Sequence, residues 1–341
     1  MIVNLLTEDK FDAYDDFINS QPDSLFFQTS KYQKLLSIIL GIDISTIVVE
    51  KEGNIVGALP LMGKDGDIGR VYNSLPFYGS NGGIIAIDDE VRNIIVDYYY
   101  KLLAEPNVAI GMVSTNPLSQ VKKDILNCDI VEDRNCQVTT ISGISSSDEL
   151  MTKFHYKTRN MIRKSEKMGV SFEVDNTAMP FLYNTHRLNM EAIGGIAKPK
   201  IFFDNIDKIY KPGVDYKIWV AKLDSKPISA ILLFYYKNII EYYTPVVDAE
   251  FRNLQSNSFL IYQAMLDGTL NGYKYWNWGG TWKSQTNLYR FKSRFGAKDH
   301  SYKYYINVVN KDVFKSTKSL LLDKYSYFFT IPFDKIESPS I

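Results

Sequence analysis

The sequence lacks several features that would assign it to a familiar class of protein. Its two cysteines, Cys128 and Cys136, have the spacing of neither a zinc knuckle nor a Cys-x-x-Cys redox pair, so we expect no disulfide framework. The three histidines share no ligand-like spacing, and no metal site is expected. The 39 Lys and Arg residues balance 39 Asp and Glu residues. An anionic partner must therefore be held by a local cluster, and DNA is not an expected partner.

Long apolar runs are also missing. No stretch approaches about 18 uninterrupted apolar residues, and the N-terminal run is too short, and lacks the basic flank, for a signal peptide. We therefore expect a cytoplasmic protein. The aromatic stretch at 325–333 could make at most a peripheral contact with a membrane, and a buried C-terminal packing segment is the simpler interpretation.

The chain is long and apolar enough to bury a large core. With 341 residues, of which 45% are hydrophobic, it is expected to form about two domains. Two segments, residues 45–61 and 216–234, each contain two β-rich runs joined by polar turn residues. Each segment predicts a β-hairpin, and together they form a weak internal repeat.

A domain boundary is expected near residue 146. Residues 141–148 are mostly small, and Ser146 and Glu149 have the spacing of a helix capping box. The apolar residues that follow recur on one helical face: Leu150, Phe154, Met161 and Met168. This pattern predicts a helix that opens a new domain.

Helices and strands alternate in the second half, which is typical of an α/β or α+β fold with mixed sheets. After the helix at Ser146, the patterns predict a strand at 170–174, a helix at 180–193, the second hairpin, a strand at 239–244, a helix from 258 and a strand at 274–278. We expect an N-terminal domain at 1–145, a C-terminal domain at 146–310, and a helical tail at 311–341 that packs back on the first domain.

Two segments of the first half combine aromatic side chains with groups that can bind a ligand. Residues 27–34 join aromatic residues to two lysines, Lys31 and Lys34, on a predicted helix. Residues 73–83 are rich in turn formers beside Tyr78, and glycines there allow the backbone to approach a sugar or peptide closely. A solvated helix face and an ordinary tight turn are the simpler alternatives.

Two further motifs lie in the second half. From Lys153 to Lys167 six basic residues stand against one acid, with Arg159 on the basic face, although a solvated face would look the same. The sequences WNWGGT at 276–281 and NLYRFKSRFG at 287–296 mix aromatic and basic residues. In the second of these, the two phenylalanines could face the core while the basic residues face water.

The order of the elements, the paired hairpins and these motifs resemble the FemAB-like proteins, which are tandem GNAT domains. The resemblance covers most of the chain and implies two GNAT-like domains with a cleft between them. It also implies N-acyl or aminoacyl transfer. The residues that it implies at the site are Lys34, with Lys31 as the alternative, and Tyr78, Arg159, Lys198, Trp278, Phe291 and Lys292.

Acyl transfer to an amine requires a neutral amine, a donor carbonyl held in line, and groups that stabilise the developing oxyanion. No Ser-His-Asp or Cys-His constellation is evident, which favours direct attack by the amine. Lys292 could neutralise a donor phosphate or the oxyanion. Glu241 and Glu191 are equal candidates for the general base, and the substrate's own phosphate is an alternative. Either carboxylate could instead be merely solvated.

The donor is suggested by the segment after the predicted strand at 239–244. Acetyl-CoA-dependent GNAT enzymes hold the pyrophosphate with an Arg/Gln-x-x-Gly-x-Gly/Ala turn at a helix N-terminus. Here Arg252 is present, but Gln255 and Asn257 stand where glycines are expected. Ser256, Asn257 and Ser258 could still cap the helix and bind an anion. The donor is therefore acyl-CoA or aminoacyl-tRNA, and no permanently bound cofactor is expected.

Three functions remain open. The first is transfer of an acyl group from acyl-CoA to the amine of a nucleotide- or lipid-linked amino sugar in cell-surface polysaccharide synthesis. The second is aminoacyl-tRNA-dependent modification of a muropeptide, a precursor of the peptidoglycan cell wall. The third is a non-catalytic module that binds a glycan or nucleotide sugar. The neutral overall charge favours acyl-CoA over tRNA, because each phosphate contact of tRNA normally requires a Lys or Arg.

Overall fold

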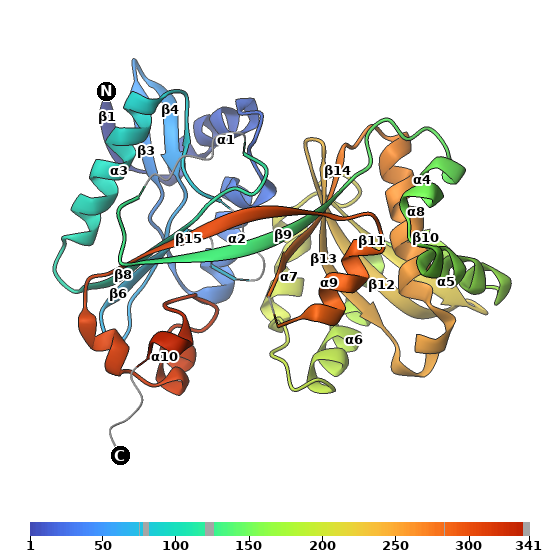
Figure 1. The fold of residues 1–341 in the computed structure, drawn as a ribbon. Coiled ribbons are helices and arrows are strands. Elements are labelled where there is room, and N and C mark those ends of the chain that lie inside the picture. The colour runs from blue at the N-terminus through green and yellow to red at the C-terminus, as the bar shows by residue number, and fades with distance from the viewer. Residues whose placement is uncertain (75, 78–81, 120–125, 283, 337–341) are drawn as a thin grey trace. The chain divides into compact units, whose positions relative to one another are not determined.

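The computed structural model describes residues 1–74, 76–77, 82–119, 126–282 and 284–336. Two compact units are present: Met1–Arg134 together with Ser301–Ile341, and Asn135–His300 (Figure 1). The chain passes between the units in two long strands, β9 (Ile130–Thr140) and β15 (Lys298–Val308). The sequence-based ranges 1–145, 146–310 and 311–341 stay a prediction about domains.

The first unit contains two groups of strands. An antiparallel sheet has the order β1-β3-β4-β7, with bounds Ile2–Leu5, Ile47–Lys51, Asn54–Leu59 and Ile85–Ala86. The second group has the order β15-β8-β6-β5-β2, where the last four are Val108–Ser114, Arg70–Asn73, Met62–Lys64 and Asp43–Ile44. The α-helices of the first unit are α1 (Phe11–Ser20), α2 (Ser30–Leu40), α3 (Asp89–Leu103) and α10 (Lys318–Lys324).

Local sequence explains the main elements of the first unit. The turn at Glu52 and Gly53, both with positive φ, joins β3 to β4 and confirms the first predicted hairpin. Thr29 begins α2 by accepting a hydrogen bond from Tyr32, and Gly41 ends it in the left-handed conformation. The helix α3 then packs against β3 and β4 and connects to β8, which runs parallel to β6.

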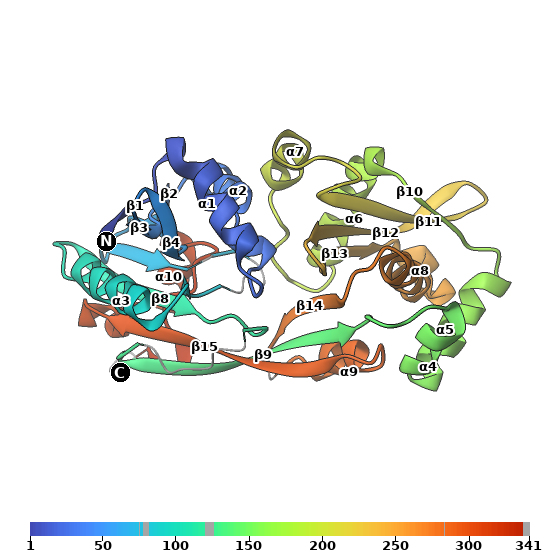
Figure 2. The ribbon, with the colours of Figure 1, turned by 90° about the horizontal axis from the view of Figure 1, so that it is seen from above.

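The second unit has one mixed sheet of six strands. Their order is β10-β11-β12-β13-β14-β9, where the first five are Ser171–Val174, Tyr216–Leu223, Lys226–Tyr236, Ile239–Val247 and Tyr275–Thr281. The helices are α4 (Ser147–Lys153), α5 (Tyr156–Lys167), α6 (Met179–Glu191), α7 (Lys200–Ile209), α8 (Ser256–Leu270) and α9 (Thr286–Ser293). In Figure 2, α5 and α8 lie on one face of this sheet and α6 and α7 on the other. The second predicted hairpin is confirmed as β11 and β12.

The helix predicted after Ser146 is wrong in one respect. Ser146 does cap α4 by accepting from the Glu149 N–H, but the pattern continues in a second helix rather than in one long helix. Phe154 takes an extended conformation and ends α4, and His155 caps α5 by accepting from the Lys157 N–H. The predicted apolar face holds only in part: Leu150 and Phe154 enter the core, where Ile162 of α5 joins them, but Met168 is 50% exposed. Among the described residues no helix is long and apolar enough to cross a membrane.

Candidate active site

Two parallel strands of the second unit separate at Glu241 and Asn277. The strands β13 and β14 pair over three residues, and Glu241 opposite Asn277 is the last pair. Beyond it, β13 continues to Val247 along β12, while β14 continues to Thr281 along β9. Strands that diverge leave facing edges with backbone groups available to a ligand. The divergence therefore makes an opening in the sheet.

Glu241 is a buried carboxylic acid at this opening. It is 2% exposed and alternates with Ile240 and Tyr242, which pack in the core on the α8 side. Burial raises the pKa of Glu241 to about 8, although the neighbouring Asn277 amide acts to lower it. A carboxyl group with a pKa near the operating pH can exchange a proton with a substrate.

Several buried polar atoms near the opening have no hydrogen-bond partner among the described residues. They are Glu241 Oε1, Thr244 Oγ1, Asn277 Nδ2, Trp276 Nε1 and Ser256 Oγ. Native proteins pair nearly all such groups, because an unpaired polar atom in a low-dielectric interior is destabilising. We expect this concentration of unpaired polar atoms on β13, β14 and the start of α8 at a site that binds a polar ligand.

Lys292 extends from α9 as a buried cation. It is 3% exposed, and Nζ donates to Thr281 Oγ1 at 2.8 Å, to the Gly280 carbonyl at 3.1 Å and to the Gly279 carbonyl at 3.3 Å. None of these acceptors is charged. Burial lowers the pKa of Lys292 to about 8. The alternative in which Lys292 faces water is wrong, while Phe295, with no exposed surface, does face the core.

Cys136 shows that Glu241 and Lys292 lie near one another. The Cys136 thiol donates to Asn277 Oδ1 at 3.1 Å. On the backbone, Cys136 of β9 pairs with Gly280 of β14. Burial raises the pKa of Cys136 to about 12; a negative Glu241 adds to this rise and a positive Lys292 opposes it. The thiolate is therefore scarce at neutral pH, which makes Cys136 unsuited to covalent catalysis.

An aromatic cluster surrounds the α8 side of the opening. Trp278 is 3% exposed, and its Nε1 donates to Thr139 Oγ1 at 2.9 Å. The ring of Phe291 packs against Trp278, with 6.1 Å between the centroids, and Tyr242 does so at 4.9 Å. Trp278 and Phe291, both expected at the substrate, thus have core positions here, and their contact with substrate stays a prediction.

The start of α8 is polar and lacks acidic residues in its first turn. Ser256 and Ser258 are buried, and Asn257 Nδ2 lies 3.4 Å from the Tyr242 hydroxyl. Gln255 precedes them with φ of 61°, a left-handed conformation that glycine adopts more easily. The turn thus keeps a glycine-like backbone without glycine. Arg252 is exposed in the short helix before it, so its expected role in donor binding stays a prediction.

Lys198 lies in the loop between α6 and α7, and its side chain reaches β13, the strand that carries Glu241. It is 7% exposed, and its Nζ lies 5.2 Å from the centroid of Tyr243, a residue of β13. Burial lowers the pKa of Lys198 to about 7. The Lys198 N–H donates to His186 Nε2 at 3.0 Å, and burial together with Lys198 lowers the pKa of His186 to about 4. An anionic substrate group would favour the charged form of Lys198.

The other expected site residues are placed differently. Arg159 donates to the Phe154 carbonyl at 2.6 Å and so holds the junction of α4 and α5. Glu191 is exposed at the end of α6, paired with Arg187 at 2.5 Å. Lys34 belongs to the first unit, where its Nζ lies 4.6 Å from the Phe11 ring centroid. Tyr78 lies outside the described residues. The expected roles of these four residues stay predictions.

Sequence reasoning missed Asn277, Cys136 and Thr281. A usable signal existed for Asn277, because an amide between two tryptophans on a buried strand must point away from the face that the rings occupy. Thr281 also lines a cavity of about 480 Å³ with Trp282, Tyr289 and Arg290. This cavity gives a ligand room directly beside the hydroxyl that binds Lys292.

Comparison with known proteins gives one family match and several similar structures. Residues 152–302 match the family described as acetyltransferase (GNAT) domain. The crystal structure of FemX is similar over 92% of this chain and 99% of its own, with 16% identity and a TM-score of 0.69. A conserved protein of unknown function from Bacteroides thetaiotaomicron covers 90% of this chain and 100% of its own, with 10% identity and a TM-score of 0.60.

A third similar structure is the C-terminal domain of a putative lysylphosphatidylglycerol synthetase from Agrobacterium fabrum. It covers 87% of this chain and 91% of its own, with 13% identity and a TM-score of 0.53. No match was found among curated protein sequences. At these identities, the three structures establish a common fold.

Proposed function

We propose that this chain, a GNAT acyltransferase by its family match and FemAB-like by its fold, transfers an acyl group from acyl-CoA to the amine of an amino sugar. The acceptor sugar is nucleotide- or lipid-linked, and the product serves cell-surface polysaccharide synthesis. The expected family, enzyme class and α/β tandem fold are confirmed. The donor, the acceptor and the roles of individual residues are the proposal.

One observation carries this proposal: a buried acid, Glu241, lies where two strands separate, and its Oε1 has no hydrogen-bond partner in the part of the chain that the structure describes. The acceptor amine must lose a proton as its nitrogen attacks the thioester carbonyl. Glu241, as a carboxylate, takes that proton while the new C–N bond forms. The C–S bond then breaks, and the CoA sulfur leaves as a thiolate that is protonated by solvent or by Glu241. Glu191 is the weaker candidate because it is solvated and ion-paired.

Lys292 supports the same step through its charge. The carbonyl oxygen becomes negative as the amine attacks, and a buried ammonium group stabilises that charge more strongly than one in water does. The hydrogen-bond acceptors of Lys292 are all neutral, and no salt bridge to Lys292 occurs among the described residues. A phosphate of the donor would benefit in the same way, so Lys292 serves either at the oxyanion or at the donor.

The start of α8 supports a CoA donor. Helix N-termini attract anions through their N–H groups and the helix dipole, and this one adds a buried Ser256 hydroxyl for which the described residues offer no hydrogen-bond partner. The neutral overall charge also fits a small donor better than tRNA. Lys198, buried at Tyr243, supports a phosphate-linked acceptor, because binding a phosphate would offset the unfavourable burial of its charge.

A second candidate is aminoacyl transfer from aminoacyl-tRNA to a peptidoglycan precursor or lipid. The similar fold of the putative lysylphosphatidylglycerol synthetase domain favours it, because that name denotes an aminoacylated lipid. The same buried acid and cation would serve, since the nucleophile is again an amine or hydroxyl and the electrophile an ester carbonyl.

A comparison of donor substrates tests the proposal. The full chain is incubated with acetyl-CoA, longer acyl-CoAs or charged tRNA, each with UDP-linked amino sugars and muropeptides, and the products are weighed by mass spectrometry. An acylated amino sugar with matching thiol release supports the proposal. An aminoacyl mass gain only with charged tRNA would replace it by the second candidate. Binding of acceptor without any transfer would overturn both.

A further inference from the structure

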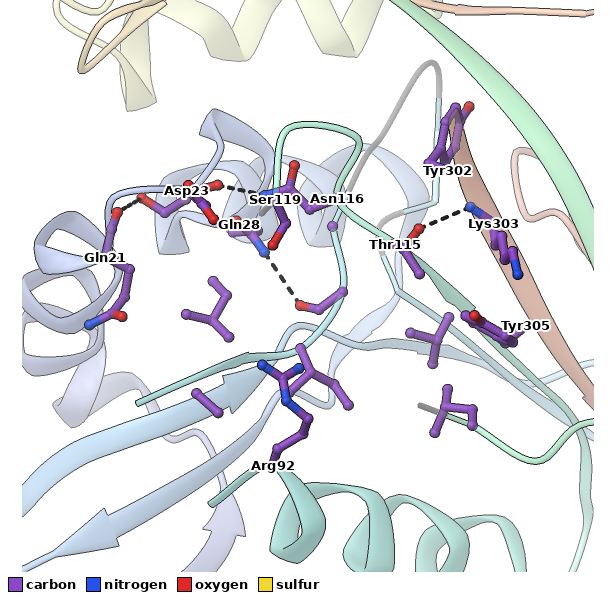
Figure 3. Close-up of a pocket in the computed structure, with 18 of the residues that line it drawn as sticks. Gln21, Asp23, Gln28, Arg92, Thr115, Asn116, Ser119, Tyr302, Lys303 and Tyr305 are labelled. Atoms are coloured by element: carbon purple, nitrogen blue, oxygen red, sulfur yellow. Dashed lines mark hydrogen bonds between the residues drawn. The ribbon is translucent and has the colours of Figure 1, made fainter. Parts of the chain in front are cut away.

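The first unit contains a cavity that shares no residue with the proposed acyl-transfer site. It has a volume of about 450 Å³, and every residue that lines it belongs to the first unit. The lining comes from the segment after α1, from β7 and the residues before it, from α3, from the end of β8, and from the middle of β15. Figure 3 shows polar side chains from these elements around a common space.

Arg92 is the buried charge of this cavity. The residue is 9% exposed on α3, and its guanidinium group extends toward the space in Figure 3. Its Nε lies 3.8 Å from Asp89 Oδ1 and has no hydrogen-bond partner among the described residues. Burial lowers the pKa of Arg92, and Asp89 offsets this only in part. Asp89 is itself largely exposed, so its charge is screened by water.

The polar side chains around Arg92 are held in place by hydrogen bonds. The buried Gln28 donates through Nε2 to the Gly83 carbonyl at 3.3 Å. Asn116 donates to the Asp23 carbonyl at 2.5 Å, and Thr115 Oγ1 accepts from the Lys303 N–H at 2.9 Å. Fixed donors and acceptors bind a ligand without first losing side-chain entropy. The cavity therefore presents one buried cation, Arg92, among fixed polar groups; the other charged residues that line it, Asp23, Asp133 and Lys303, are more exposed.

We propose that this cavity binds a small polar molecule through its carboxylate or phosphate group, which the guanidinium group of Arg92 holds. Arginine matches both anions because its N–H groups can donate to two oxygens at once. Binding would also supply Nε with the partner that it lacks. Hydroxyl or amide groups of the ligand would then meet Asn116 and Thr115. The proposal concerns the first unit alone and does not depend on the acyl-transfer reaction.

The test is a titration of the full chain with four simple probes. Inorganic phosphate and acetate represent the two anions, while glucose 1-phosphate and glucuronate add hydroxyl groups to each; glucose serves as the neutral comparison. Calorimetry should show saturable binding of at least one anion pair, with the sugar derivative tighter, and at least about tenfold weaker binding of glucose. A preference for one pair identifies the anion. Failure of both anion pairs to bind would overturn the proposal.

Variants locate the binding within the cavity. Arg92→Gln should weaken the anion about 10- to 100-fold, because a charge-assisted hydrogen bond is lost. Asp89→Asn should tighten it a few-fold, since the competing carboxylate is removed. Ala86→Phe fills the cavity without changing Arg92 and should abolish binding of the anion. Lys101→Gln, an exposed change on the same helix, should leave affinity unaltered. Unchanged affinity in both Arg92→Gln and Ala86→Phe would show that the anion binds elsewhere.

Discussion

The two units contain the same motif, two parallel strands joined through a helix, but the strand ends differ. In the second unit β13 and β14 separate at Glu241 and Asn277, where Glu241 Oε1 and Asn277 Nδ2 have no hydrogen-bond partner among the described residues. In the first unit β6 ends one residue before Ser74 and β8 ends at Ser114, and these two serines hydrogen-bond to each other through hydroxyl and backbone groups. One opening thus carries a buried acid, and the other is closed by neutral hydroxyls. From this contrast we expect the chemistry in the second unit.

The helices that lie between these pairs of strands also differ, in the charge of their N-terminal residues. In the first unit α3 begins with acidic residues, and Asp88 caps it by accepting from the Val91 N–H at 2.8 Å. In the second unit α8 begins with neutral polar residues. A helix N-terminus that already holds carboxylates repels a further anion, whereas a neutral one attracts it. We therefore expect the donor at α8, and any anion in the first unit at Arg92.

The largest expected effect comes from removing the acid at the second opening. Glu241→Gln keeps the size of the side chain but cannot accept the proton, so kcat/KM should fall by about 10² to 10⁴. Glu166→Gln, on the exposed face of α5, is the matched control and should retain activity. Steady-state rates with acyl-CoA and the amino sugar measure both. Full activity in Glu241→Gln would remove Glu241 from catalysis, and loss in Glu191→Gln alone would move the base to α6.

The next effect comes from the buried cation. Lys292→Met preserves an apolar chain of similar length but removes the ammonium group, so kcat should fall about 10²-fold or more. Lys298→Gln, an exposed lysine at the start of β15, should change little. If KM for the donor rises while kcat is kept, Lys292 binds the donor phosphate rather than the oxyanion. A variant with unaltered kcat and KM would contradict both roles.

A smaller effect concerns stability against pH. The pKa of Glu241 is about 8 in the folded state, above its ordinary value of 4.5, so between these values the folded state retains a proton that the unfolded state releases. Its contribution to stability is complete below pH 4.5 and is lost as pH rises toward 8. Glu241→Gln should therefore be more stable than the parent at neutral pH, by roughly 1–3 kcal/mol.

Urea unfolding of the parent and of Glu241→Gln across this pH range measures the difference. The gain should shrink toward zero as the pH approaches 4.5, where the parent carboxyl group is neutral in both states. A gain that is the same at every pH would mean that the pKa of Glu241 is the same in the folded and unfolded states.

Much of the fold was predictable because its signals are local. Alternation of apolar residues gave both hairpins and the strands that carry Glu241 and Asn277, and cap residues such as Ser146 marked helix starts. The break between α4 and α5 was not predictable from apolar spacing, because Phe154 keeps the same core contact in an extended backbone.

The candidate site was predictable only in part. Motif and strand position predict roles for Lys292 and Glu241 that stay predictions, and the sequence ranks Glu191 equally with Glu241. Burial distinguishes them in the structure, and burial depends on packing across β12, β13 and α6, which no local pattern encodes. The same limit applies to Arg92, since a lone arginine on a helix gives no sign that it faces a cavity.

The smallest expected effect compares the turn before α8 with a left-handed residue in a hairpin turn of the first unit. Gln255 and Glu52 both adopt left-handed backbone, with φ of 61° and 52°, so replacing either by glycine removes strain but adds freedom to the unfolded chain. Both variants should gain about 0.5 kcal/mol in urea unfolding.

Gln255→Gly should leave KM for acyl-CoA within about twofold, because the Gln255 side chain donates back to the Arg252 carbonyl at 3.2 Å. An unaltered KM with a gain in stability means that the backbone for anion binding is already formed without glycine. A tenfold fall in KM would instead show that the Gln255 side chain obstructs the donor. In that event the missing glycine weakens donor binding, and only the second unit would respond, since Glu52→Gly changes a hairpin turn far along the chain from α8.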